Sequence, residues 1–188
     1  MVIRDLLIRG MIAGLIAGVL TLGWATAFGE PQIGQAIRFE AGQEQTTGAA
    51  HEAPLVSRTV QETIGLGTAV VIVGLVFGGL FALGFAVVYG RFLRTQARVT
   101  ALVLAVAGFC AASLIPFLKY PANPPAVGQP ETIGRRTTLY FAMILIALLT
   151  TILAAALARR WHDRFGAWNA TLLALAAYVA VIAIAYVV

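Results

Sequence analysis

The chain has 188 residues, of which 60% are hydrophobic and 11% charged, and its mean hydropathy is +0.89. Soluble domains carry about 25% charged residues, and a folded chain of this size keeps much of its surface in water, so the composition excludes a soluble enzyme. The net charge of +5 does not indicate a nucleic-acid partner, because the basic residues occur singly or in threes beside apolar runs, as charges that set membrane topology do.

Five apolar runs follow one another along the chain, at about residues 6–28, 64–89, 99–118, 138–158 and 167–187. Each is long enough to cross roughly 30 Å of hydrocarbon as a helix, and helix is the expected state because each span must satisfy its own backbone hydrogen bonds. We therefore predict an all-α integral membrane protein, a five-transmembrane-helix bundle that forms one membrane domain over residues 1–188. Ala25-Thr26-Ala27 resembles a signal-peptide cleavage site, but the first run is longer than a signal's apolar core, so we interpret it as an uncleaved helix.

Small residues form a stripe in the first run, at Gly10, Gly14 and Gly18, and the second run carries Gly74 and Gly78. Such stripes let helix backbones approach closely, which matters because lipid provides no hydrophobic drive between helices. Two interpretations remain open: a tight pair or partner-binding face formed by the first two helices, and ordinary packing within the chain.

The connection after the first run, residues 29–63, contains five glutamates. The helical spacing of Ile33, Ala36 and Ile37 predicts a short amphipathic helix over residues 31–45 on the membrane surface.

The same connection contains His51 and Glu52, and His51 is one of two histidines in the chain. Imidazole and carboxylate both bind borderline divalent metals, so this pair is a candidate metal contact. The alternative interpretation is a solvated surface pair.

The third connection, residues 119–137, has four prolines between positions 121 and 130. Proline removes a backbone donor and fixes φ, so helix is excluded there and an extended cap over the bundle is predicted. The oxygens of Asn123 and Glu131 give this cap candidate metal ligands, while Lys119, Tyr120, Pro121, Pro124 and Pro125 form the rest of its motif. A rigid linker between two helices explains the prolines equally well.

The distribution of charge predicts an orientation. Eight basic residues fall at the N-terminus and in the second and fourth connections, and five fall in the first and third connections, which are longer. The positive-inside rule then places the N-terminus in the cytoplasm and the C-terminus outside a bacterial inner membrane.

Catalytic signatures are absent from the sequence. It contains no GxxxxGK[ST], HExxH or GxSxG pattern, and no charged residue falls near the middle of a predicted span, which argues against a self-contained pump. We predict no enzyme activity, no catalytic residue and no bound cofactor.

Four segments, in the same order along nearly the whole chain, resemble the CbtA family. They are Phe28-Gly29-Glu30-Pro31, Leu55-Val56-Ser57-Arg58, the proline-rich stretch from Phe117 to Gly134 and Gly166-Ala167-Trp168-Asn169. The members of this family are proposed cobalt transporter subunits with five predicted spans.

The resemblance implies uptake of Co²⁺, or another divalent metal, for cobalamin synthesis. It also implies a small one-span partner, CbtB, with a histidine-rich end that handles metal. The resemblance also makes five motif positions functional candidates: Glu30, Lys119, Tyr120, Asn123 and Glu131. Two departures reduce the ligand set of this chain: Gln129 replaces an expected aspartate, and the first connection has only His51 where relatives carry several histidines.

A second hypothesis comes from a different class, a non-catalytic accessory or scaffolding subunit of a larger membrane protein complex. The glycine stripes, the lack of charge within the spans and the reduced ligand set support it. Both hypotheses predict that the chain contacts membrane lipid and other membrane proteins, and neither predicts a nucleic-acid partner.

Overall fold

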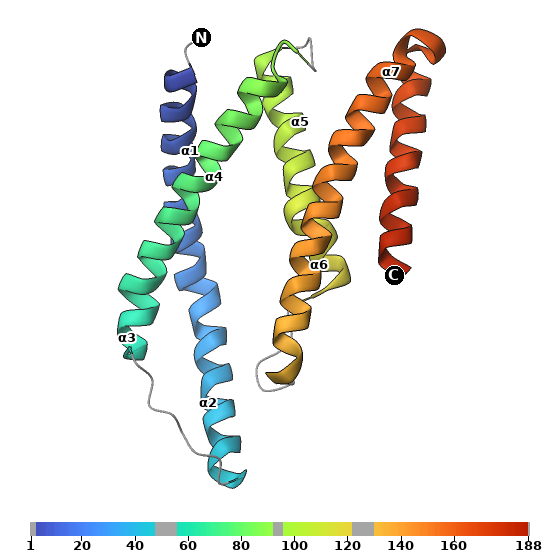
Figure 1. The fold of residues 1–188 in the computed structure, drawn as a ribbon. Coiled ribbons are helices and arrows are strands. Elements are labelled where there is room, and N and C mark those ends of the chain that lie inside the picture. The colour runs from blue at the N-terminus through green and yellow to red at the C-terminus, as the bar shows by residue number, and fades with distance from the viewer. Residues whose placement is uncertain (1–2, 48–55, 92–95, 122–129, 188) are drawn as a thin grey trace. The chain divides into compact units, whose positions relative to one another are not determined.

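The computed structural model describes residues 3–47, 56–91, 96–121 and 130–187. The secondary-structure elements within these ranges are helices (Figure 1). The predicted all-α class is confirmed. The chain divides into two compact units, with the division between Ala86 and Val87, and each unit is described by itself.

The first unit consists of two long helical rods that lie side by side (Figure 1). One rod runs through α1 (Ile3–Trp24), the wider π-helical turn η1 (Ala25–Gly29) and α2 (Glu30–Thr47). The other runs through α3 (Arg58–Val60), the π-helical turn η2 (Gln61–Gly65) and α4 (Leu66–Val88). The helix predicted over residues 31–45 is therefore present as α2, but it prolongs α1 and is not a separate element.

Glycines bring α1 and α4 into backbone contact. A Cβ atom built on Gly10 or Gly14 would fall under 3.0 Å from the carbonyl oxygen of Gly78 or Gly74, closer than real Cβ atoms approach, and the reverse is true of Cβ atoms built on Gly74 and Gly78. The two stripes therefore pack against each other, so a tight pair of the first two helices, packed within the chain, is confirmed. A partner-binding face stays a prediction. The close approach replaces hydrophobic drive with dense van der Waals contact.

Proline explains two of the π-helical turns. Pro31 has no N–H group, and in a regular α-helix its ring would clash with the carbonyl of residue 27. In η1 the N–H of Glu30 instead bonds to the carbonyl oxygen of Ala25, five residues back, and the wider turn makes room for the ring. Pro116 follows η3 (Cys110–Leu114) in the same way, with the N–H of Ile115 bonded to the carbonyl oxygen of Cys110.

The second unit contains α5 (Ala97–Phe109), η3, α6 (Ile115–Lys119), the short 3₁₀ turn η4 (Pro130–Thr132) and the 55-residue α7 (Ile133–Val187). Its core is made of apolar side chains from η3, α6 and both parts of α7, namely Ala111, Ile115, Met143, Ala147 and Ile182. Tyr178 and Tyr186 pack against this core from the end of the chain.

Gly166 interrupts α7. Its φ of 76° and ψ of 164° lie in a region that essentially only glycine adopts, and the helix reverses direction there (Figure 1). A side chain with a Cβ atom at this position would strain the turn, which explains why glycine occurs between two apolar runs.

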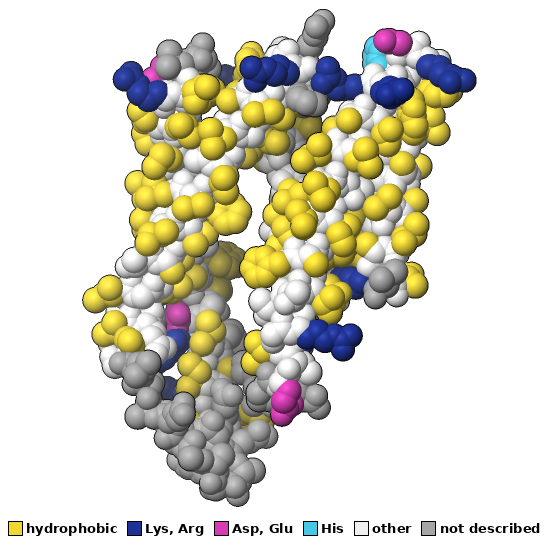
Figure 2. Space-filling view, viewed as in Figure 1, with side chains coloured by type: hydrophobic (Ala, Val, Ile, Leu, Met, Phe, Trp, Pro, Cys, Tyr) yellow, Lys and Arg dark blue, Asp and Glu magenta, His cyan; other side chains and the backbone are white. Residues whose placement is uncertain are grey.

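Four helices are long and apolar enough to cross a membrane within the part of the chain that the structure describes: Ile3–Phe39, Arg58–Val88, Ala97–Lys119 and Ile133–Val187. The last of these contains both the fourth and the fifth runs predicted from the sequence. In the most apolar 18-residue stretch of each helix, taken in chain order, only 6%, 11%, 17% and 17% of the residues are buried inside the protein. The apolar side chains thus face outward along the helices, with Lys and Arg gathered toward helix ends (Figure 2), as expected for helices that lie in lipid.

The glycine contact predicts a position-specific loss of stability. Gly14→Ala places a methyl group against the Gly74 carbonyl, and because both groups belong to backbone, the helices must move apart. We expect the free energy of unfolding to fall by about 1–3 kcal/mol, measured by detergent-mediated unfolding followed through tryptophan fluorescence. Gly23→Ala on the same helix is the matched control, since nothing lies within 4 Å of its built Cβ atom. Equal stability of the two variants would contradict the backbone contact.

Candidate functional site

The residues singled out by the sequence fall into three groups. His51, Glu52, Asn123, Pro124 and Pro125 lie outside the described residues. Glu30 belongs to the first unit, while Lys119, Tyr120, Pro121 and Glu131 belong to the second. Each unit is therefore considered for the site that it forms alone.

In the first unit, Glu30 forms an ion pair with Arg58. The Nη2 atom of Arg58 donates a hydrogen bond to Oε2 of Glu30, and Nε of Arg58 lies 3.8 Å from Oε2 of Glu62. The side chain of Glu30 is 15% exposed, that of Arg58 36% and that of Glu62 41%. The side chain of Glu30 is thus the least exposed to water of the three. Its carboxylate requires the guanidinium of Arg58, because an unpaired charge with little access to water is costly.

The π-helical turns position this cluster. Glu30 is the first residue after η1, and Glu62 lies within η2. Such turns occur frequently at functional sites because they alter the direction of side chains along a helix. Here they bring two carboxylates from separate rods to one arginine. The cluster carries two negative charges and one positive charge, so it retains attraction for a further cation.

In the second unit, Glu131 does not take part in a comparable cluster among the described residues. It lies on the turn η4, and it is exposed. Groups of three or more His, Cys, Asp and Glu side chains that could hold a metal ion are not found within residues 3–47, 56–91, 96–121 and 130–187.

Lys119 has a contact that the sequence did not predict. Its Nζ atom donates a hydrogen bond of 2.5 Å to the carbonyl oxygen of Ala185 and lies 5.3 Å from the ring centroid of Tyr120. The last carbonyls of a helix have no partner within the helix and carry partial negative charge, so Lys119 caps the end of α7. Tyr186 strengthens the same junction, because its hydroxyl donates to the carbonyl oxygen of Ile115 at 2.6 Å.

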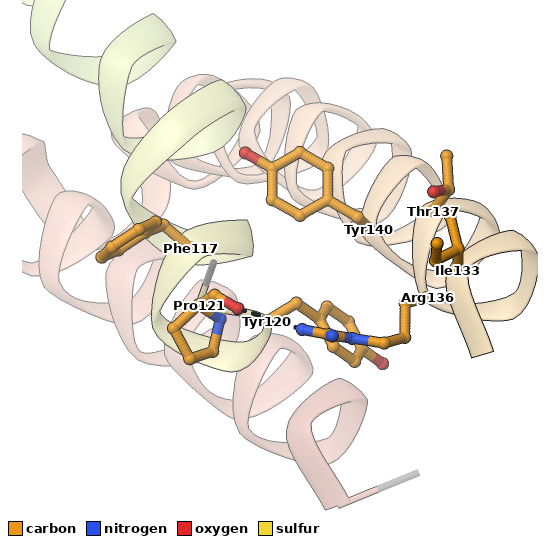
Figure 3. A pocket seen from close by; sticks show the side chains of 7 residues that line it. All are labelled: Phe117, Tyr120, Pro121, Ile133, Arg136, Thr137 and Tyr140. Carbon is orange, nitrogen blue, oxygen red and sulfur yellow. Dashed lines mark hydrogen bonds between the residues drawn. The ribbon is translucent and has the colours of Figure 1, made fainter. Parts of the chain in front are cut away.

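A pocket of about 400 Å³ lies between the end of α6 and the start of α7 (Figure 3). Tyr120 and Pro121 form part of one side, and Arg136 and Tyr140 form part of the other. An Nη2 atom of Arg136 donates to the carbonyl oxygen of Pro121 at 3.2 Å. The candidates Tyr120 and Pro121 are therefore brought together here, beside an arginine and not beside a carboxylate.

Sequence reasoning found Glu30 in the first site and Tyr120 and Pro121 in the second, but it missed their charged partners. Glu30 was a candidate, but Arg58 and Glu62 were not, although their four-residue spacing beside an apolar run is typical of paired charges on a helix. Tyr186 and Arg136 were also missed. Tyr186 contacts a residue 71 positions away, and no local pattern indicates such a contact.

Comparison with known proteins gives one match. Residues 3–188 match the model of a family described as probable cobalt transporter subunit (CbtA). Searches of curated proteins and of solved structures found no match.

The ion pair predicts coupled losses of stability. Glu30→Gln or Arg58→Gln leaves the other charge without its partner, and we expect each to lower the free energy of unfolding by about 1–2 kcal/mol, less than for a fully buried pair because Arg58 is partly exposed. The double variant should lose about 1 kcal/mol less than the sum of the two. Arg38→Gln, at an exposed position of α2, is the control and should change little. Additive losses in the double-mutant cycle would show that the two charges do not interact.

Proposed function

We propose, because the chain belongs to the CbtA family of probable cobalt transporter subunits, that it is the membrane subunit of a cobalt uptake system that supplies cobalamin synthesis. The observation that supports a role in handling the metal is the shielded carboxylate of Glu30, held by Arg58 with Glu62 nearby.

In this proposal the guanidinium of Arg58 takes the place of the metal ion beside Glu30 when no metal is bound. Cobalt(II) is a borderline metal that binds carboxylate oxygen as well as imidazole nitrogen. A dication that displaces the guanidinium would balance the charges of Glu30 and Glu62 completely, whereas Arg58 balances only one of them. The exchange releases Arg58 toward water, where it is already partly exposed.

The remaining ligands are proposed to come from the loops and from a partner. The family description names a subunit, which implies further chains in the transporter. We propose that a small one-span, histidine-rich protein of the CbtB type supplies imidazole ligands. We also propose metal contacts at His51, Glu52, Asn123 and Glu131 of this chain.

We further propose a single membrane domain with five spans in a bacterial inner membrane. The reversal of α7 at Gly166 supports the division of this helix into two spans, residues 138–158 and 167–187. The segments proposed to face the cytoplasm carry eight basic and two acidic residues, and those proposed to face outward carry five basic and six acidic residues. This asymmetry supports a cytoplasmic N-terminus and an external C-terminus.

The five-span arrangement predicts that the two termini lie on opposite sides of the membrane, whereas four spans would place them on the same side. Alkaline phosphatase fused after Val188 should therefore be active in cells, because it reaches the periplasm. Fused after Arg160, between the proposed fourth and fifth spans, it should be inactive. The reverse pattern would refute the orientation, and an inactive C-terminal fusion together with a cytoplasmic N-terminus would refute the fifth span.

The transport role is tested by uptake of labelled cobalt under cobalamin limitation. Removal of the protein should reduce uptake, and Glu30→Gln should reduce it about tenfold, as the loss of a group important for metal binding does. Asp163→Asn is the control, because this carboxylate is 99% exposed in the turn between the two parts of α7. All variants are compared at equal amounts of protein in the membrane.

The exchange between metal and arginine makes a separate prediction for the purified protein. Arg58→Gln should bind Co²⁺ more tightly than the unchanged chain although it is less stable, because the competing guanidinium is gone, while Glu30→Gln should bind it more weakly. Weaker binding by both variants would refute the exchange. Unchanged uptake in cells without the protein, with stable co-purification in a larger complex, would favour the accessory or scaffolding role.

A further inference from the structure

The pocket between α6 and α7 has the wrong charge for a metal cation. Arg136 is the charged residue among the side chains described as lining it. Arg136 lies in the first turn of α7, the end of a helix that carries partial positive charge, and Arg135 precedes it. Glu131, on the adjacent turn η4, does not line the pocket. Together these charges repel Co²⁺ and attract an anion.

The guanidinium of Arg136 is suited to a phosphate. The guanidinium has five N–H donors, and its bond to the carbonyl oxygen of Pro121 uses one of them. The hydroxyl-bearing side chains of Tyr120, Thr137 and Tyr140 line the same pocket (Figure 3). Arginine binds phosphate oxygens in a two-pronged geometry, whereas the hydroxyl groups of Thr137 and Tyr140 point away from the Arg136 guanidinium (Figure 3).

The apolar walls and the size of the pocket distinguish a lipid from a small ion. Phe117 and Ile133, which also line the pocket, are 54% and 62% exposed, so each has an apolar surface that can contact acyl chains. A volume of about 400 Å³ is larger than a phosphate ion requires, and it leaves room for the glycerol part of a lipid headgroup. The pocket also lies at the end of an apolar helix, where Tyr and Arg side chains contact the headgroup layer.

We infer that this pocket binds the phosphodiester headgroup of an anionic phospholipid, with Arg136 as the main contact and with Phe117 and Ile133 against the acyl chains. The site fixes the junction of α6 and α7 at the membrane–water interface. It does not include Glu30, Arg58 or Glu62, the cluster proposed to handle the metal.

Native mass spectrometry of the purified protein tests this inference, with phosphatidylglycerol and phosphatidylcholine of identical acyl chains offered in equal amounts. The unchanged protein should retain phosphatidylglycerol preferentially. Arg136→Gln should weaken this retention about fivefold, the effect expected for one basic residue at a lipid surface. Arg160→Gln, in the basic part of α7 that precedes Gly166, is the matched control and should retain it unchanged at the same site.

Two further measurements complete the test. The first distinguishes a lipid headgroup from a free phosphate ion, and the second shows whether a loss of binding comes from misfolding. Excess inorganic phosphate should not displace the lipid; displacement would assign the pocket to a free anion and overturn the lipid. Arg136→Lys keeps the charge and should keep most of the preference even if Arg136→Gln fails to fold. Equal retention of the two lipids by the unchanged protein, or loss of the preference in Arg160→Gln to the same extent as in Arg136→Gln, would overturn the inference.

Discussion

In hydrocarbon, a backbone N–H or C=O group without a partner costs several kcal/mol, and this cost governs the structure. It requires helix wherever the chain crosses lipid, and it makes every proline inside a long helix a local problem. At Pro31 and Pro116 the chain solves this problem with a π-helical turn, in which a bond reaches five residues back. One of these turns directly precedes Glu30, the carboxylate that pairs with Arg58.

The two units use different means of packing. In the first unit, glycines at positions 10, 14, 74 and 78 remove side chains from the contact between α1 and α4, and the helices pack backbone to backbone. In the second unit, small and medium-sized apolar side chains fill the space between η3, α6 and α7, and hydrogen bonds from Lys119 and Tyr186 join α6 to the end of α7. Substitutions should therefore act differently: added volume is harmful in the first unit, and lost polar bonds are harmful in the second.

The two candidate sites also differ in the sign of their charge. The cluster of Glu30, Arg58 and Glu62 has an excess of negative charge and attracts cations. The pocket beside Arg136 has an excess of positive charge and attracts anions. Both sites contain residues of the segments that resemble the CbtA family, so the resemblance alone does not say whether a position in these segments serves metal, lipid or packing. The contacts of each side chain make that distinction: Lys119, a functional candidate by resemblance, caps a helix.

The sequence by itself determined the membrane class, the helical state of the apolar runs, the glycine stripes along the first two runs and the family. Each of these follows from local composition or from spacing along one helix, which a reader of the sequence can measure directly. Only the tertiary structure decided that the stripes pack on each other, that α2 continues α1, that Arg58 joins Glu30 across 28 positions and that Arg136 meets Pro121. Contacts of this kind depend on how separate helices lie against each other, and no periodicity within one segment contains that information.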